Sequence, residues 1–290
     1  MKVTNVGACP GGDAFLILTK QKAALVDSGF SFCADKMIRN IKTLLGNRTL
    51  DYVLLTHSHY DHASGSAYCR QSFQNVKVLG SAYAAKIFSK PTAIAVMREM
   101  NASAARPYGM TEFTDKLEDL KIDLTVREGD VIDLGDVSLQ VMEAPGHTKC
   151  SIAFYIPRGK MLISCETMGV HAAEHLVSPA CLVGYEMSVN FIKRTMELDI
   201  EKLLVPHYGV LTGKSCRDFL ADALRSNRQL KEMIVEDYEH GKTQEEIIRH
   251  YRDVFYTAEC QKNQPVQAFN LNASYLVPMI LKETFHKVSN

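Results

Sequence analysis

The chain has 290 residues, and its 33 Lys and Arg residues balance its 33 Asp and Glu residues to a formal net charge of zero. A neutral chain has no bulk attraction for nucleic acid or for an anionic membrane surface, so neither is expected as a partner. With 46% hydrophobic and 23% charged residues, the composition is that of a globular protein with a sizeable core.

The N-terminus, residues 1–5, has no charged segment followed by an apolar one, so no export signal is recognised. The longest apolar runs, such as Ala14–Leu18, are too short to span a bilayer. Eight cysteines are scattered between Cys9 and Cys260 without a C-x-x-C pair. We therefore expect a cytoplasmic protein with free thiols.

The first half of the chain alternates short apolar runs with amphipathic segments, which indicates strands alternating with helices. A helix is predicted over Ala34–Leu45, because its apolar residues recur at helical spacing and Gly46 follows its end. Residues 91–112 are less regular, and two interpretations stay open: a lid over one face, or a peripheral helix that packs its methionines. Further strands are predicted over Ala14–Leu18, Ala23–Val26, Tyr52–Leu55 and Val76–Leu79, and further helices over Ser64–Phe73 and Ser81–Ser89.

The second half begins with strands and ends with helices. Thr243 followed by Glu246 is a capping-box signature that opens a helix, and Pro278 is expected to kink the last helical segment. Strands are predicted over Ile122–Val126, Val131–Leu134, Val137–Met142, Ser151–Ile156, Met161–Ile163 and Lys202–Val205, and helices over Met187–Leu198, Asp218–Tyr238 and Val266–Phe285. The pattern predicts an α/β body followed by a helical appendage.

Four metal-binding side chains fall within six residues directly after a predicted buried strand: His57, His59, Asp61 and His62. Neutral imidazoles and carboxylates are the usual ligands of Zn²⁺ and related first-row metals. A turn that leaves a strand end can direct His57 and His59 to one metal, with Asp61 and His62 directed toward a second. Such a cluster is rare by chance, so a solvated polar turn is the weaker interpretation. His147, in the sequence Pro-Gly-His-Thr after a predicted strand, is a candidate further ligand.

The run Thr-His-Ser-His-Tyr-Asp-His, followed about 85 residues later by Pro-Gly-His-Thr, resembles the metallo-β-lactamase superfamily over roughly residues 12–213. The resemblance implies a four-layer αβ/βα sandwich with a dinuclear metal site, here followed by a C-terminal helical appendage. Residues 1–213 would form the metallo-β-lactamase-like domain, and residues 214–290 a helical region covering the mouth of the active site. By the same resemblance, His57, His59 and His147 hold the first metal, Asp61 and His62 help hold the second, and Asp27 supports the site from behind.

Two positions depart from the family pattern. The bridging carboxylate is usually an aspartate in a Gly-Asp pair, whereas here Cys165-Glu166 occupies that place and Glu166 is the natural candidate. The last histidine of the family usually follows Pro-Gly, whereas here the sequence is Pro206-His207-Tyr208. His207 is favoured as the ligand, and Tyr208 stays open as an alternative ligand. Both departures concern the bridge or the second metal.

Other polar residues near these motifs are given simpler roles. Cys165 is interpreted as a small buried thiol rather than as a ligand. A solvated loop is the favoured interpretation of three further residues, and surface or packing roles that of the histidines in the helical tail. The loop residues are His171, Glu174 and His175, and the tail histidines are His240, His250 and His286.

The chemistry that this site predicts is hydrolysis by metal-activated hydroxide. Binding to a divalent metal lowers the pKa of water toward neutrality, and Asp61 could orient or deprotonate that water as the catalytic residue. Two divalent ions are expected as cofactors, Zn or Fe with Mn also open, because this ligand set accepts all three metals.

The substrate class rests on a weaker likeness. The segment from Phe269 to Tyr275 resembles the tail of the branch that contains the quinolone-signal response thioesterase, which implies a small-molecule ester or thioester, an acyl-CoA type included. Two alternatives are a metal-binding sensor or interaction protein with little catalysis, and an iron-dependent oxidoreductase similar to persulfide dioxygenases. The alternating H-x-H form argues against the flavodiiron branch. The sequence leaves the metal, the acyl group and a homodimer open.

Overall fold

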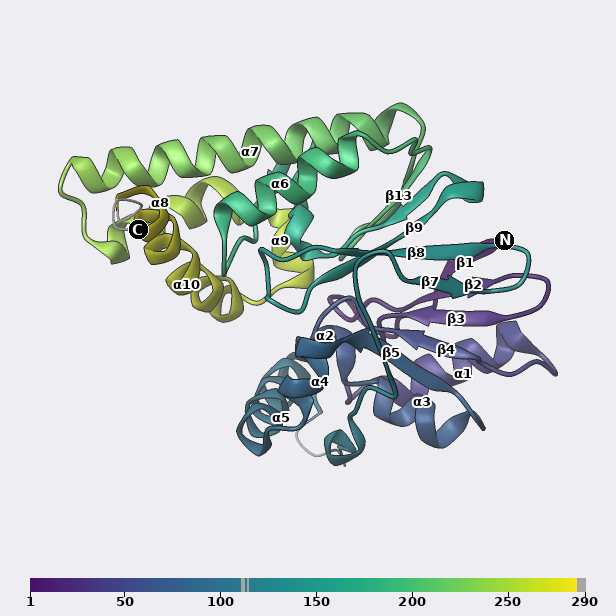
Figure 1. The fold of residues 1–290 in the computed structure, drawn as a ribbon. Coiled ribbons are helices and arrows are strands. Elements are labelled where there is room, and N and C mark those ends of the chain that lie inside the picture. The colour runs from purple at the N-terminus through teal and green to yellow at the C-terminus, as the bar shows by residue number, and fades with distance from the viewer. Residues whose placement is uncertain (111–112, 114, 286–290) are drawn as a thin grey trace. The chain divides into compact units, whose positions relative to one another are not determined.

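The computed structural model describes residues 1–110, 113 and 115–285 (Figure 1). The chain divides into two compact units. Unit 1 comprises Met1–Glu143 and Ile152–Gly159, and unit 2 comprises Ala144–Ser151 and Lys160–Asn290. The predicted domain division after residue 213 falls where the long helix α7 begins at Lys214, and it stays a prediction.

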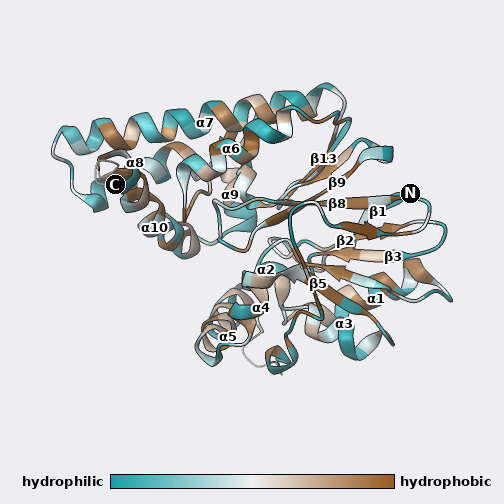
Figure 2. Ribbon diagram, viewed as in Figure 1, coloured by the Kyte–Doolittle hydropathy of each residue, from teal (hydrophilic) through white to brown (hydrophobic). Residues whose placement is uncertain are grey.

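Unit 1 contains a six-stranded sheet with the strand order β1-β2-β3-β4-β5-β6. The first three strands pair antiparallel, and β3 to β6 pair parallel, with Ala24 opposite Tyr52 and Val26 opposite Leu54. All four residues of β3 are buried, and the central strands are hydrophobic in Figure 2, as expected for parallel strands covered on both faces. The strands are β1 (Lys2–Asn5), β2 (Phe15–Leu18), β3 (Ala23–Val26), β4 (Tyr52–Leu54), β5 (Lys77–Ser81) and β6 (Leu124–Val126).

The helices of unit 1 begin with α1 (Ala34–Leu45), which has the predicted bounds and buries Met37, Ile38 and Ile41. The helix predicted over Ser64–Phe73 is present at Ser66–Ser72, within two residues at each end. A short helix at Tyr60–Ala63 that was not predicted precedes it, and the two are separated at Ser64 and Gly65, where Gly65 N donates to the Gly29 carbonyl. The remaining helices are α2 (Tyr60–Ala63), α3 (Ser66–Ser72), α4 (Ala82–Phe88), α5 (Pro91–Ala105), η1 (Arg106–Tyr108), η2 (Leu117–Asp119) and η3 (Pro157–Gly159).

Residues 91–112 include a well-formed helix, α5, which starts with a proline at its first position, where a missing N–H costs nothing. Met97 is buried, and the buried Asn101 side chain accepts from Ser31 N and donates to Ser64 Oγ, each at 2.9 Å. These contacts agree with the packing-helix interpretation. The lid interpretation stays a prediction, and Thr111 and Glu112 lie outside the described residues.

Three further strands complete unit 1, and unit 2 has strand pairs of its own. In unit 1, β7 (Val131–Asp133), β8 (Ser138–Glu143) and β9 (Ile152–Ile156) pair antiparallel. In unit 2, β10 (Met161–Ile163) and β13 (Lys202–Val205) pair parallel, and β13 pairs antiparallel with β14 (Gly209–Thr212). A separate hairpin consists of β11 (Val170–Ala173) and β12 (Leu176–Ser178). Every predicted strand is present to within two residues at each end.

The helices of unit 2 surround their own apolar core, which includes Leu230, Tyr251, Phe255 and Phe269. The predicted capping box is confirmed, since Thr243 Oγ1 accepts from Glu246 N while the Glu246 side chain accepts from Thr243 N. The last helix, α10 (Val266–Phe285), continues through Pro278, and the kink expected there stays a prediction. His286 lies outside the described residues. The helices are η4 (Glu166–Met168), α6 (Tyr185–Met196), α7 (Lys214–Glu239), α8 (Gln244–Phe255), α9 (Ala258–Asn263) and α10 (Val266–Phe285).

Among the described residues, none of the helices combines the length and the apolar composition that a bilayer crossing requires.

Candidate metal centre

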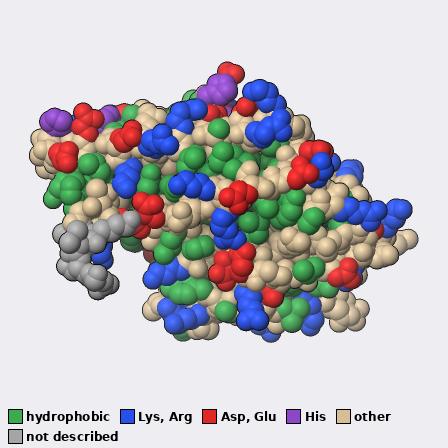
Figure 3. All heavy atoms as spheres, turned by 45° about the horizontal axis from the view of Figure 1, so that its top comes forward, with side chains coloured by type: hydrophobic (Ala, Val, Ile, Leu, Met, Phe, Trp, Pro, Cys, Tyr) green, Lys and Arg blue, Asp and Glu red, His purple; other side chains and the backbone are tan. Residues whose placement is uncertain are grey.

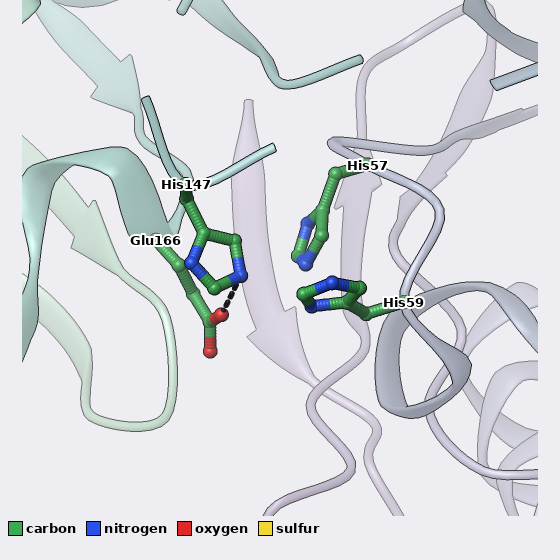
Figure 4. Close-up of side chains that lie close together, drawn as sticks. All are labelled: His57, His59, His147 and Glu166. Carbon is green, nitrogen blue, oxygen red and sulfur yellow. Dashed lines mark ion pairs between the residues drawn. The ribbon is translucent and has the colours of Figure 1, made fainter. Parts of the chain in front are cut away.

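Unit 1 brings together the four predicted ligands that follow strand β4. The chain leaves β4 at Leu54, and helix α2 begins at Tyr60, so His57 and His59 lie on the connecting turn and Asp61 and His62 on the helix. The ring of His57 lies 4.7 Å from that of His59 and 4.2 Å from that of His62, measured between centroids (Figure 4 shows the first pair). His57 and His62 are buried, and the Asp61 carboxylate lies 3.6 Å from His62 Nε2.

Asp27 accepts three hydrogen bonds from residues of this turn and of helix α2. Its Oδ1 accepts from Thr56 N at 2.8 Å, and its Oδ2 accepts from Thr56 Oγ1 and from His62 Nδ1, each at 2.8 Å. Because the Thr56 hydroxyl donates its hydrogen to Asp27, its oxygen is left to accept from His57 Nδ1, which lies 3.0 Å away. Both histidines then carry the lone pair on Nε2, the atom that binds a metal. This is the supporting role that the resemblance implied for Asp27.

A close backbone approach fixes Asp27 and His62 relative to each other. Asp27 adopts a left-handed conformation with φ 53°, which aspartate tolerates better than most residues do. Ser28 donates to the His62 carbonyl from its N at 2.6 Å and from its Oγ at 2.9 Å. A Cβ atom added to Gly65 would lie 2.0 Å from the Ser28 carbonyl oxygen, so this position requires glycine.

In unit 2, His147 is presented by a turn that also requires glycine. Gly146 has φ 146°, and a Cβ atom there would lie 2.1 Å from Ser188 Oγ. His147 is buried and donates from Nδ1 to the Ala180 carbonyl at 2.8 Å, while its backbone N donates to Thr167 Oγ1 at 3.2 Å. The Nδ1 hydrogen bond leaves the lone pair of His147 on Nε2, the atom with which it would bind a metal.

Glu166 lies between two histidines of unit 2. Its Oε2 is 2.5 Å from His147 Nε2 (dashed in Figure 4), and its Oε1 is 2.6 Å from His207 Nε2. When His147 is neutral with its hydrogen on Nδ1, the atom that faces the carboxylate is a lone pair, and two basic atoms at this distance need a cation in common. A proton or a metal ion meets that need, so the donor set of unit 2 fits a divalent metal.

The side chains of His207 and Tyr208, the two alternatives for the last ligand, have different surroundings. The His207 side chain is 7% exposed and faces Glu166, whereas Tyr208 is 46% exposed and stacks on His171 with a centroid separation of 4.1 Å. His207 has a left-handed backbone, with φ 59°, and its carbonyl accepts from Asn263 Nδ2 on α9 at 3.0 Å. The turn thus sends the two side chains in different directions, and it is His207 that joins the carboxylate.

The residues given simpler roles divide into two groups. Cys165 is fully buried, as expected for a core thiol, and Glu174 and His175 have side chains 93% and 65% exposed at the turn between β11 and β12. His171 differs from the expected loop residue, because it lies on strand β11 and burial lowers the pKa of its imidazole. This segment forms a strand rather than the expected loop because it pairs with β12.

The structure also reveals supporting residues that the sequence did not single out. Thr56 contacts the ring of the predicted ligand His57, Thr167 accepts from the backbone N of His147, and Asn263 donates to the backbone carbonyl of His207. The position of Thr56, next to His57 in the sequence, could have indicated its role. Nothing in the sequence around Asn263 connects it with residue 207.

The surface drawn in Figure 3 shows basic and acidic side chains interspersed rather than gathered by sign. This agrees with the zero net charge of the chain.

Comparison with known proteins defines the family. Residues 8–207 match the Metallo-beta-lactamase superfamily. A metallo-beta-lactamase family protein from Thermus thermophilus has a similar structure, with a TM-score of 0.70, 17% identity, and coverage of 99% of this chain and 95% of that one. An archaeal superfamily protein from Sulfolobus tokodaii has a TM-score of 0.63, 17% identity, and coverage of 97% and 98%. The fold, including the helical C-terminal region, is therefore shared over nearly the whole chain.

Among characterised sequences, a hydroxyacylglutathione hydrolase from Ruegeria pomeroyi is 32% identical over 120 residues, which cover 41% of this chain and 34% of that protein. A protein of the same name from Brucella anthropi is 25% identical over 123 residues, with the same coverage. The chain thus matches about a third of the length of these relatives. It belongs to the metallo-β-lactamase superfamily, and the αβ/βα sandwich expected from the sequence is confirmed.

Proposed function

We propose that this protein is a dinuclear metallohydrolase of small thioesters or esters. His57, His59 and His147 would hold one divalent metal, and Asp61, His62 and His207 the other, with Glu166 between them. The ligand sets of the two units would thus serve the same pair of ions, as the resemblance of the motifs implies. Zn and Fe are the metals expected.

The observation that carries this proposal is the placement of Glu166. Each of its two oxygens faces the ring nitrogen of a different histidine, His147 on one side and His207 on the other. A carboxylate arranged in this way can give one oxygen to each of two metals, which a ligand of a single metal does not need to do. Glu166, which has one methylene more than the usual aspartate, is the first residue of the short helix η4.

When bound, divalent ions supply Lewis acidity, which lowers the pKa of water and polarises the acyl oxygen. The residues of the chain orient the ligands and move protons. The Asp61 carboxylate, half-buried on α2, would accept a proton from the attacking water and return it to the leaving thiolate. Asp27 keeps His57 and His62 in the tautomer that binds metal, through Thr56 in the first case and directly in the second.

The thioester class is supported by the relatives named hydroxyacylglutathione hydrolase, which share part of this chain's length. The motifs also agree with the thioesterase-containing branch that the C-terminal segment resembles. A small-molecule substrate agrees with the zero net charge of the chain, which gives no bulk attraction for nucleic acid. A cytosolic location stays a prediction, and so does a homodimer.

The test combines metal analysis with a substrate panel. Protein purified without added metal is assayed for metal content and then for hydrolysis of a hydroxyacylglutathione, an acyl-CoA, a simple ester and a phosphodiester. We expect two equivalents of Zn or Fe per chain and turnover of at least one thioester. Glu166→Gln is expected to lose one equivalent and to reduce turnover, since the amide cannot give an anionic oxygen to each metal.

Two other results would contradict the proposal in different ways. Two bound metals with no turnover on any substrate would favour the sensor alternative. Iron together with oxygen consumption on a persulfide substrate would favour the oxidative alternative. His240→Ala, an exposed change at the end of α7, serves as the matched control and is expected to leave both readouts unchanged.

A further inference from the structure

Two cysteines that are distant in the sequence meet in unit 1. The Sγ atoms of Cys9 and Cys33 lie 2.8 Å apart, and 24 positions separate the residues along the chain. All eight cysteines are at described positions, and each is a reduced thiol. Cys9 and Cys33 differ from the other six in burial, because they are half-buried while the others are buried. The pair therefore combines sulfur contact with partial access to solvent.

The surroundings of the pair make its two thiols unequal. Cys33 is the N-cap residue of the twelve-residue helix α1, where the helix dipole favours a negative charge, and Lys36 lies in the first turn. The hydrogen bond from the Cys9 thiol, assisted by Lys36, lowers the pKa of Cys33 although burial opposes this shift. The same contact with Cys33, together with burial and the charge of Asp13, raises the pKa of Cys9. Cys33 is thus the thiol of the pair that loses its proton more readily, and Cys9 the one that keeps it.

The pair is built into an aromatic cluster next to the ligand motif. Cys9, Cys33 and Tyr60 pack against a buried cluster that includes Phe30 and Phe32, whose rings stack at a centroid separation of 4.9 Å. Phe30 lies three residues after Asp27, and Tyr60 lies between two predicted ligands, His59 and Asp61. The rings of Phe30 and Tyr60 are 5.6 Å apart. The cysteines therefore pack, within unit 1, against Phe30 and Tyr60. Phe30 is close in sequence to Asp27, and Tyr60 is close in sequence to His62.

We propose that Cys9 and Cys33 form a redox-active dithiol, which low-molecular-weight disulfides convert to an intramolecular disulfide. The inference is independent of the proposed hydrolase activity, because it rests on the sulfur pair and its surroundings alone. It assigns a chemical role to a site apart from the predicted metal ligands. Its co-reactant is a small disulfide of the glutathione type.

The reaction is a two-step thiol–disulfide exchange. The Cys33 thiolate attacks one sulfur of the small disulfide, forming a Cys33 mixed disulfide and expelling the first small thiolate. Cys9 loses its proton and attacks Cys33 Sγ, forming the Cys9–Cys33 bond and expelling the second small thiolate. Counted from the two thiol forms, the cysteine pair loses two electrons and two protons; the small disulfide gains both and leaves as two thiols, the first of which takes up the proton that Cys33 lost on ionisation.

The experiment incubates the full-length protein with glutathione disulfide and follows each cysteine by peptide mass spectrometry. In the wild-type protein, the number of free thiols after denaturation is expected to fall by two, from eight to six, with a Cys9–Cys33 crosslinked peptide. Cys69, which is buried and whose pKa burial raises to about 12, serves as the internal control and should stay unmodified. Dithiothreitol should restore all eight thiols.

Single variants separate the two roles. Cys9→Ser keeps a hydroxyl donor toward Cys33, so we expect Cys33 to accumulate the glutathione mixed disulfide that it can no longer resolve. Cys33→Ser leaves Cys9 with its proton and is expected to react at least about tenfold more slowly, since thiolate is the reactive form. These rates are measured only on variants whose circular dichroism spectrum matches that of the wild type. In the wild-type protein, samples taken at short times should contain the Cys33 mixed disulfide before the Cys9–Cys33 disulfide, which tests the order of attack without any substitution.

Three results would overturn the proposal. These are eight thiols remaining after prolonged incubation, oxidation of a buried cysteine before this pair, and disulfide-linked dimers in place of the internal crosslink. Each would show that the contact between Cys9 and Cys33 does not produce exchange chemistry. None would bear on the hydrolase, whose metal content and turnover are measured separately.

Discussion

The two units supply their predicted ligands in contrasting ways. Unit 1 takes four predicted ligands from one six-residue run, and a single carboxylate, Asp27, hydrogen-bonds to His62 directly and contacts His57 through Thr56. Unit 2 takes its predicted ligands from three separate places in the chain, and their surroundings differ: His147 donates to the Ala180 carbonyl, Glu166 opens helix η4, and the His207 carbonyl accepts from Asn263. A contiguous set depends on one anchor, whereas a dispersed set depends on several.

This difference predicts how each set fails. Loss of the anchor in unit 1 should disturb two ligands together, because both hydrogen-bond to the same carboxylate or to the threonine that it holds. Loss of one support in unit 2 should disturb a single ligand. Substitutions in the two units should therefore differ in the number of metal equivalents that they release.

The largest effect is expected from His57→Ala combined with His59→Ala. The pair removes two of the three ligands proposed for the first metal, and turnover should fall by about 10⁴-fold or more because metal-activated water is lost. Metal content, measured by elemental analysis, should fall to one equivalent or below. Retained activity would eliminate unit 1 as a catalytic ligand set, and His240→Ala provides the matched exposed control.

The second comparison is between neighbours in unit 2. His207→Ala is expected to release one metal equivalent and to reduce kcat/KM by roughly 10²- to 10³-fold, on the scale of lost electrostatic stabilisation at an active site. Tyr208→Phe keeps the ring that stacks on His171 and should retain both metals. If Tyr208→Phe released a metal and His207→Ala did not, Tyr208 would be the ligand and our assignment of His207 wrong.

A smaller effect is expected at the anchor of unit 1. Asp27→Asn keeps the size of the side chain but removes the charge and one acceptor, so His62 loses the partner that sets its tautomer. We expect about a 10- to 100-fold loss of metal affinity, which is the usual effect of removing an outer hydrogen-bond partner of a ligand. Competition with a chelator measures it. A loss confined to one equivalent would show that Asp27 does not couple the two histidines.

The smallest effect is expected in the helical part of unit 2, away from the predicted ligands. Burial acts to raise the pKa of Asp237, but hydrogen bonds from Lys242 and His250 outweigh it and lower that pKa below its ordinary 3.8. A lowered pKa in the folded state stabilises the fold above pH 3.8, and this contribution is lost as the pH falls through the folded-state value.

Asp237→Asn should therefore cost about 1–3 kcal/mol of stability at neutral pH, the usual cost of weakening a hydrogen-bonded charged group. The difference in thermal midpoint from the wild type should shrink as the pH falls below about 4, the ordinary pKa of an aspartate, while metal content at neutral pH stays unchanged. A constant difference at all pH values would show that packing, not charge, is what the substitution removes.

The sequence predicted contiguous features well and dispersed ones poorly, for a physical reason. Helix α1 has its predicted bounds because apolar spacing and Gly46 are local signals. The ligand run was recognisable because its members are adjacent. The break at Gly65 was missed because it arises from packing against Ser28, which is distant in the sequence, and the support of His207 by Asn263 depends on tertiary contacts. Strands β1, β11, β12 and β14 were also missed, since strands of three or four residues carry little hydropathy pattern.

The stacked pair of His171 and Tyr208 also has an optical consequence. The chain has twelve tyrosines and no tryptophan, so Tyr208→Trp would introduce its sole indole. That fluorophore would lie against the His171 ring, one residue from His207 and partly open to solvent. Its emission would report on the turn that carries His207 without interference from any other indole. The absence of tryptophan, uninformative about the fold, makes this turn directly observable in solution.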